Sequence, residues 1–490
     1  MASRKQSRGK SGAGNLKHLT PRAGSPAPKS DFGFLFPLLF GLLLGLALLK
    51  FGNPVILNDK VDAPGSLAEA WQNPWPPVWS GWLLLPLAAA GGWIALQNRV
   101  SWPASRWLWI LPLLWFGWQL LAATQTVDAP LTRVTLWQLG GCLACYFLGA
   151  FNLGTRRRLV WLLAGLLAAL TICLVRAVDQ KLFEFPQERQ QLLEGERMGW
   201  TNFAPEMVLQ MKSEGLILTT NGVALANPAI LAKYAKGRVF GTLVYPNALA
   251  GAVLLLWPVG LAMAFSGTHR FRKLTRGAVI ALTLFLGLGG LLWSGSKSGW
   301  LIVLAMLGVW LTQQLTWSRR VKVGVIGALV VLGLAAFGVR FHQYFSAGAP
   351  SVDARFGYWR AAAQITIDHP LLGTGPGTFQ RPYAAIKLPD AEMARMTHND
   401  FLEQFCDSGI VGGLAYLTWI LLLLTQLRKV VVRQADVLRQ SIFIGVLGWF
   451  AQGFSEFSLY VPALAWTAFA LAGALLGNEK TESMAANGKV

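Results

Sequence analysis

The sequence predicts an all-α, polytopic membrane protein with about twelve membrane-spanning helices. Of its 490 residues, 54% are hydrophobic and 13% are charged, and the mean hydropathy is +0.44, which together lie outside the usual composition of soluble domains. Long apolar runs recur along the chain. The short segments between these runs are alternately rich and poor in Lys and Arg, as the loops of a multi-pass membrane protein are.

Twelve apolar runs are the predicted spans. They cover residues 32–50, 82–97, 107–123, 134–151, 159–175, 239–265, 278–293, 300–316, 323–338, 409–427, 440–456 and 460–477. Several are slightly shorter than the ~20 residues that cross a bilayer, so we expect little tilt or a contribution from flanking residues. The first run is too long for the core of a signal peptide and has no clear small-residue cleavage site, so we expect it to remain as a span.

The basic residues predict how the chain is threaded, because short cytoplasmic loops retain Lys and Arg whereas short translocated loops avoid them. With the N-terminus inside, the short outer loops hold only Lys60, Arg133 and Lys297, one each. The short inner loops hold Arg99 and Arg106; Arg156, Arg157 and Arg158; Arg270, Arg272, Lys273 and Arg276; Arg319, Arg320 and Lys322; Arg428, Lys429, Arg433 and Arg439. This pattern predicts cytoplasmic termini at both ends. The net charge of +20 is then largely an orientation signal, and we expect no nucleic-acid binding.

The remaining segments complete the predicted organisation. Residues 1–31 carry many Lys, Arg, Ser, Gly and Pro and predict a disordered cytoplasmic tail, and residues 478–490 form a second tail. Spans one to five occupy 32–175, spans six to nine 239–338, and spans ten to twelve 409–477. The two long loops, 176–238 and 339–408, both face outward, and loops of this length usually have a function.

The first long loop contains two local signals. Gln187–Arg197 predicts a polar helix, and the short runs on either side of Asn221-Gly222, within Ile217–Leu225, predict a β-hairpin. A loop that takes part in function and a purely structural cap over the bundle are both open.

The residues that the spans lack exclude several classes of protein. Their middle parts contain no Asp, Glu, Lys or Arg, and the nearest are Lys50 and Glu456 at span ends. Ion-coupled transporters and proton pumps need such groups within the membrane. No Asp-rich or His/Cys cluster predicts a metal site, and Cys142 and Cys145, inside an apolar run, predict small helix residues in lipid rather than a redox pair. The chemistry is expected at the outer membrane surface.

The second long loop carries candidate phosphate-binding residues. Asp353–Asp368 predicts an amphipathic helix with Asp353 as N-cap and Arg355 in the first turn, where a guanidinium beside free backbone amides suits a diphosphate. Arg355 could instead reach lipid phosphates or stack on Trp359, and Arg360 has the same alternatives. The following Gly/Pro-rich stretch, His369–Gly377, predicts a tight turn, with a phosphate-binding nest as the alternative.

His398 is a candidate general base. Thr397 and Asp400 have the spacing of a capping box before an apolar helical run, which places His398 in the first turn of a helix at the membrane face. The positive end of the helix dipole disfavours the imidazolium, so the ring can accept a proton at neutral pH. A catalytic and a merely structural histidine are both open on this evidence.

Three segments carry a family resemblance. They are Gly237–Ala250 at the start of the sixth span, Ser294–Gly299 between spans seven and eight, and Arg355–Phe379 followed by His398–Leu402 and Asp407–Gly409. Together they resemble the O-antigen ligase and polymerase family of polytopic membrane glycosyltransferases, over about 235–415. The resemblance implies a GT-C-like fold in the bacterial inner membrane with a periplasmic site. It also implies inverting transfer of a glycan from undecaprenyl diphosphate to an acceptor hydroxyl of lipid A-core, another glycan or a protein, without metal, nucleotide or other cofactor.

The resemblance also implies residue roles. His398 matches the family's base, and Arg238 and Arg355 match its diphosphate-binding arginines; Arg360, Asn399 and Asn247 are further candidate substrate-binding residues. The chain departs from the family pattern at two places, since Asp407 stands where Glu is frequent and Lys297 lies within the second segment. Within the family, polymerases and protein O-oligosaccharyltransferases remain alternatives to a ligase. From another class, a non-catalytic lipid or polysaccharide exporter would share the spans but would not require His398.

Overall fold

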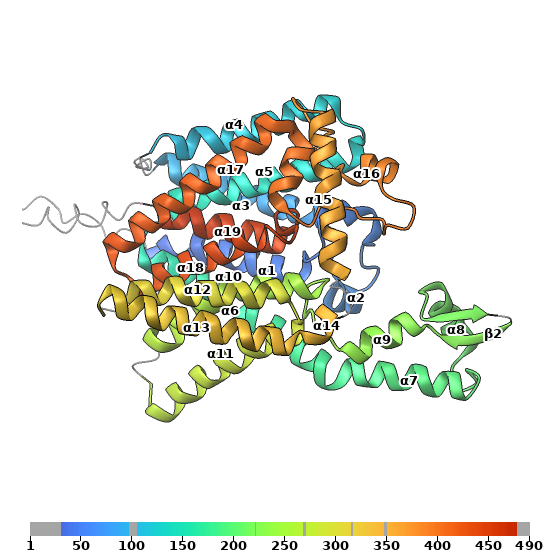
Figure 1. Cartoon of the computed structure of the whole chain (residues 1–490). Coiled ribbons are helices and arrows are strands. Elements are labelled where there is room, and N and C mark those ends of the chain that lie inside the picture. The colour runs from blue at the N-terminus through green and yellow to red at the C-terminus, as the bar shows by residue number, and fades with distance from the viewer. Residues whose placement is uncertain are drawn as a thin grey trace, which may run out of the picture. The chain divides into compact units, whose positions relative to one another are not determined.

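The computed structural model describes residues 31–97, 105–220, 222–267, 271–314, 317–346 and 350–477 (Figure 1). The predicted tails, apart from Asp31, lie outside the described residues, as do Arg99, Arg270 and Asn221. The helices belong to one unit that begins at Phe34. In chain order they are α1 (Leu35–Lys50), α2 (Leu67–Gln72), α3 (Pro77–Gln97), α4 (Trp107–Ala122), α5 (Ala129–Asn152), α6 (Arg156–Asp179), α7 (Phe185–Arg197), α8 (Pro205–Ser213), α9 (Pro228–Lys236), α10 (Pro246–Gly267), α11 (Lys273–Ser294), α12 (Lys297–Gln314), α13 (Arg319–Arg340), α14 (His342–Ser346), α15 (Pro350–Asp368), α16 (Gln380–Ile386), α17 (Asp400–Gln434), α18 (Val437–Gln452) and α19 (Pro462–Leu476).

Each of the twelve apolar runs coincides with a helix, namely α1, α3, α4, α5, α6, α10, α11, α12, α13, α17, α18 and α19. Among the described residues, eight helices are long and apolar enough to cross a membrane, and α1, α12 and α19 are shorter apolar helices. Apart from one short hairpin, the described chain is thus helical, with multiple membrane helices, while the count of twelve spans stays a prediction. One boundary differs from expectation: the run 239–265 is helical only from Pro246, a residue type favoured in the first turn of a helix.

The first long loop is folded. Helix α6 continues through a π-helical turn (Gln180–Glu184) into α7, so the polar helix predicted over Gln187–Arg197 is confirmed as part of a longer one. Strands β1 (Ile217–Thr220) and β2 (Val223–Ala226) pair antiparallel on either side of Gly222, which confirms the predicted hairpin. The side chains of Leu192, Trp200, Ile217 and Ala226 form a small separate core between these elements. Figure 1 shows α7, α8, α9 and β2 gathered together.

Close helix pairing organises the bundle. At the α5–α19 contact, a Cβ added at Gly149 would lie 2.2 Å from the Ala470 carbonyl oxygen, and one at Gly473 would lie 2.0 Å from that of Tyr146. Only glycine permits backbones to approach this closely, which is a common way of packing helices in membranes. Helix α19 is buried along its whole length, whereas the apolar window of α13 is 0% buried. Cys142 and Cys145 are free thiols buried in the core on α5 rather than facing lipid.

Contacts between helix ends define one end of the bundle, which we call the site end. The Leu48 carbonyl at the end of α1 accepts a hydrogen bond from Thr242 just before α10, and the carbonyl of Ser294, at the end of α11, accepts one from Arg238. The backbone N–H of Ala463 on α19 donates to the carbonyl of Phe51. Helices α1 and α11 therefore end where α10 and α19 begin.

The far ends of these helices carry basic residues. Lys322 donates to the carbonyl of Thr312 near the end of α12, Arg276 donates to that of Phe265 near the end of α10, and Arg439 donates to that of Gly154 between α5 and α6. Helix α10 starts at the site end and spans 22 residues, so Phe265 lies at the other end of the bundle. We call this the basic end.

Candidate active site

A buried carboxylate, that of Glu456, lies at the centre of a polar cluster at the site end. Its Oε1 accepts hydrogen bonds from Arg355 Nη2 at 2.8 Å and from Asn247 Nδ2 at 2.6 Å. Asn247 Oδ1 in turn accepts one from Arg238 Nη2 at 3.0 Å, and His398 Nδ1 lies 3.8 Å from Glu456 Oε2. The polar cluster is thus defined as Glu456, Arg355, Asn247, Arg238 and His398. Four of these five residues are candidates from the sequence, and the structure brings them together.

Arg238 lies in the non-helical segment between α9 and α10. Gly237 caps α9 in the left-handed conformation (φ 55°), and the chain then turns toward the end of α11, where Arg238 Nε donates to the Ser294 carbonyl at 2.7 Å. Burial lowers the pKa of the Arg238 guanidinium below its usual value, the negative charge of Glu456 opposes this shift, and the positive charge of Arg355 adds to it. A half-buried cation in this position favours an anionic ligand.

Arg355 lies on α15, but its placement differs from the prediction. The helix begins at Pro350, so Asp353 is in the first turn and is not the N-cap, and Arg355 lies in the second turn, away from free backbone amides. A proline is favoured in a first helical turn because its missing N–H is not needed there. The Arg355 guanidinium pairs with Glu456, where the sequence left stacking on Trp359 open. Arg360 is exposed, and no contact within the polar cluster involves it.

His398 lies just before α17, not in its first turn, so the predicted capping box is wrong. Asn399 is the N-cap: its Oδ1 accepts the N–H groups of Phe401 and Leu402, both at 3.0 Å. The Thr397 N–H donates instead to the Glu403 carboxylate. Several neighbouring residues here are of types that cap helices. Asn399 is the cap because its side-chain amide oxygen reaches two free backbone N–H groups. His398 therefore directly precedes the N-cap, still beside the N-terminus of α17, and Asn399 has a structural role as the cap.

The conformation of His398 is unusual. Its φ of 53° lies in the left-handed region, which non-glycine residues seldom adopt and which recurs at functional sites. The ring stacks on Tyr358 with centroids 5.9 Å apart and meets the edge of Phe457 at 4.8 Å. The His398 side chain is 32% exposed, so an acceptor can reach it while the aromatic rings restrict its orientation.

Asp400 joins the His398 turn to the segment that carries Glu456. Its backbone N–H donates to the carbonyl oxygens of Gly453 at 2.7 Å and Glu456 at 3.1 Å. Its carboxylate accepts the N–H of Leu459 at 3.1 Å. These bonds fix the start of α17 against the connection between α18 and α19, and so set the separation of His398 from Glu456.

The Gly/Pro-rich turn has a structural role. Helix α17 is kinked at Gly409, where φ is 67° and a Cβ would lie 2.5 Å from the Leu371 carbonyl. The turn packs into this kink, with Gly377 N–H donating to Asp407 Oδ1 at 2.9 Å and Ile410 N–H donating to the Pro370 carbonyl at 2.8 Å. Residues 373–379 are buried. The Gly/Pro-rich segment therefore forms a structural turn and not a phosphate-binding nest, and Asp407 holds this turn in place.

Two residues, one at the centre of the polar cluster and one near it, were missed as site residues. Glu456 was noted only as a carboxylate at a span end, and the signal that could have singled it out is that carboxylates are rare in the apolar runs. Lys297 Nζ lies 3.9 Å from the ring centroid of Tyr344. Burial lowers the pKa of Lys297 to about 8, and further lowering comes from the positive charges of Arg238, Arg355, Lys236 and Arg340. The site therefore holds a third, titratable cation just before the predicted span 300–316.

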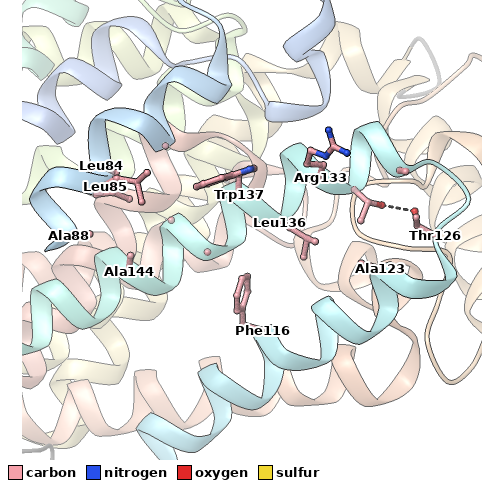
Figure 2. Close-up of a pocket in the computed structure, with 15 residues that line it drawn as sticks. Leu84, Leu85, Ala88, Phe116, Ala123, Thr126, Arg133, Leu136, Trp137 and Ala144 are labelled. Atoms are coloured by element: carbon pink, nitrogen blue, oxygen red, sulfur yellow. Dashed lines mark hydrogen bonds between the residues drawn. The ribbon is translucent and has the colours of Figure 1, made fainter. Parts of the chain in front are cut away.

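A second feature is an apolar groove of about 620 Å³ between α3, α4 and α5 (Figure 2). Its lining is mostly apolar, with residues such as Leu84, Phe116 and Ala144, and Arg133 is its one charged residue among those described. At the rim, Thr126 and Thr132 share a hydrogen bond of 2.6 Å. The groove shares no residue with the polar cluster. Over the described ranges, no three His, Cys, Asp or Glu side chains gather as metal ligands would.

The geometry defines a class: a protein with multiple membrane helices and a polar, largely basic site at one end of its helix bundle. Residues 282–417 match the family described as O-antigen ligase, so the chain carries an O-antigen ligase domain, and the predicted resemblance is confirmed. The matched segment includes His398 and Arg355, whereas Arg238, Asn247 and Glu456 lie outside it. No curated protein matches the chain. The chain is thus a protein with multiple membrane helices, of which residues 282–417 are similar to the O-antigen ligase family.

Proposed function

We propose that this protein transfers a glycan from undecaprenyl diphosphate to an acceptor hydroxyl, with the polar cluster as its active site. The observation that carries the proposal is the meeting of Arg238, Arg355 and His398 around Glu456, although they come from three separate segments of the chain. The family match supplies the substrate class, a lipid-linked glycan.

The arginines bind the diphosphate of the donor. A polyprenyl carrier keeps its chain in the bilayer and its phosphates at the headgroup level, which is where the ends of membrane helices lie. Arg355 Nε is buried without a hydrogen-bond partner among the described residues, so this guanidinium can bind a phosphate oxygen while it stays paired with Glu456. As the bond to the sugar breaks, Arg238 and Arg355 stabilise the charge that develops on the leaving diphosphate.

His398 acts as the general base. The ring takes the proton of the acceptor hydroxyl as its oxygen forms a bond to the anomeric carbon. The bond between that carbon and the diphosphate oxygen breaks, and its electron pair leaves with the diphosphate. Attack from the face opposite the leaving group inverts the anomeric centre, and no metal enters the step. General-base catalysis of this kind contributes about 10² to 10⁴-fold to a rate.

The distribution of charge supports a periplasmic site. The described Lys and Arg of the predicted inner loops, among them Arg276, Lys322 and Arg439, lie at the basic end, opposite the polar cluster. Short basic loops remain in the cytoplasm. The site end then faces the periplasm of a bacterial inner membrane, with both termini cytoplasmic.

Purified protein in lipid bilayers tests the proposal. It would receive a lipid-linked glycan donor with, in separate reactions, lipid A-core, a glycan or a protein as acceptor, and release of undecaprenyl diphosphate would be measured. The acceptor that supports release separates a ligase from a polymerase and from a protein oligosaccharyltransferase. A protein that moves lipid-linked glycan across the bilayer but never releases the diphosphate is an exporter, and the proposal is then wrong.

A further inference from the structure

We infer that Glu456 is a positioning residue that sets the tautomer of His398, so that Nε2 of the ring carries the lone pair that takes the acceptor's proton. The inference rests on the proposed function, because it concerns the same base.

One nitrogen of His398 and one carboxylate oxygen of Glu456 face each other, and neither atom has a hydrogen-bond partner among the described residues. These atoms, His398 Nδ1 and Glu456 Oε2, are 3.8 Å apart, and both are buried. The distance is longer than a hydrogen bond, and a small rotation of either side chain closes it. Catalytic hydrogen bonds are often long before substrate binds and shorten in the complex.

The carboxylate is held so that one oxygen remains for the histidine. Glu456 Oε1 accepts from both Arg355 and Asn247, which fixes the plane of the carboxylate. Its side chain is 0% exposed, so water does not compete for Oε2. A buried acceptor without a donor is costly, and an N–H on His398 Nδ1 satisfies it.

The histidine is held just as firmly. On one side of its backbone, the Thr397 hydroxyl donates to the Asn399 carbonyl. On the other side, the Asp400 N–H donates to the segment that carries Glu456. Tyr358 stacks on the His398 ring and Phe457 packs edge-on against it, and both restrict rotation of that ring. The Nδ1 edge therefore remains toward Glu456, and the opposite nitrogen, Nε2, is the one available to an acceptor.

The pairing has a chemical consequence. When Nε2 takes the hydroxyl proton, the ring becomes an imidazolium next to the Arg355 guanidinium, and two adjacent positive charges repel each other. The Glu456 carboxylate lies between them and stabilises both. The proton on Nδ1 stays there throughout, and the proton on Nε2 passes to water after the product leaves.

Glu456→Gln tests the inference, because glutamine keeps the shape and the acceptor for Asn247. Its amide nitrogen, turned toward the ring, would donate to Nδ1 and move the ring proton to Nε2, the wrong tautomer. We expect kcat to fall by about 100-fold or more while KM for the donor changes little. Glu456→Asp should recover part of the rate. Glu392→Gln, an exposed carboxylate in the same loop region, is the matched control and should keep full activity.

A spectroscopic measurement separates positioning from a purely structural role. The ¹⁵N spectrum of the histidine rings, minus that of His398→Ala, should show a proton on Nδ1 in the parent protein and on Nε2 in Glu456→Gln. An unchanged tautomer, or an unchanged kcat in Glu456→Gln, would overturn the inference. Full activity of His398→Ala would instead overturn the base in the proposed function, so the two failures are distinguishable.

Discussion

The polar cluster and the apolar groove hold their charged residues in different ways. In the polar cluster, Arg355 and Arg238 are held by Glu456 and Asn247 before any ligand arrives. In the groove, Arg133 is exposed and has no hydrogen-bond or ion-pair partner among the described residues. The groove offers volume, about 620 Å³, but no group able to accept a proton in a defined geometry. Preorganised charge, more than cavity volume, therefore distinguishes the polar cluster from the groove, and preorganised charges are what stabilise the charge that develops in a transfer reaction.

The largest expected effect is that of His398→Ala. Loss of the base should lower transfer by about 10² to 10⁴-fold, while the protein still inserts into the membrane. The measurement is diphosphate release by equal amounts of reconstituted protein. His369→Ala is the matched control, because His369 is exposed at the end of α15 and should tolerate the change. If both variants lost the same share of their transfer activity, His398 would have no special role compared with a histidine outside the polar cluster.

Next in size is the effect of Arg355→Ala. A hydrogen bond to a charged group contributes about 1.5 to 3 kcal/mol, so kcat/KM for the donor should fall by roughly 10- to 100-fold. Accumulation of unprocessed lipid-linked glycan in cells gives a second measurement. Arg238→Ala should act in the same direction, and Arg360→Ala, outside the polar cluster, should change little. Normal donor use by Arg355→Ala would contradict the phosphate role.

A smaller effect is expected from pH through Lys297. Its pKa is lowered to about 8, so it is charged below that value and loses its charge as pH rises through it. The donor KM should therefore increase between about pH 7 and about pH 9 as one cation is lost from the site. The Lys297→Arg variant keeps its charge over this range, and its KM should be flat. A KM that rises equally in parent and variant would show that another group titrates.

The smallest effect should come from filling the groove. Ala144→Phe adds volume inside its lining, and we expect transfer to change by less than about threefold because no group of the polar cluster moves. Transfer rate and thermal stability would be measured together. A loss as large as that of Arg355→Ala, with stability unchanged, would mean that a substrate chain occupies the groove.

The sequence predicted what depends on local pattern. Apolar runs predicted the helices, and the turn residues around Gly222 predicted the hairpin, because both depend on neighbours along the chain. Helix starts were less predictable: Pro350 rather than Asp353 begins α15, and Asn399 rather than Thr397 caps α17. In both places several suitable residues lie within one turn, and tertiary contacts decide between them.

The candidate site shows the same division. Short motifs marked His398, Arg238 and Asn247. Glu456 was missed because its importance arises from partners 101 and 209 residues away in the chain, Arg355 and Asn247. No local pattern around a single glutamate at a span end reports such contacts.

 The backbone N–H of Asp400 bonds to Gly453, and its carboxylate bonds to Leu459, so the piece that carries His398 is completed only by residues beyond 450. A gene fragment that ends at residue 417 would encode His398 without Glu456. Complementary fragments cut after 417 would have to associate before the polar cluster could form, and chimeras exchanged at that point would combine two halves of the polar cluster from different parents.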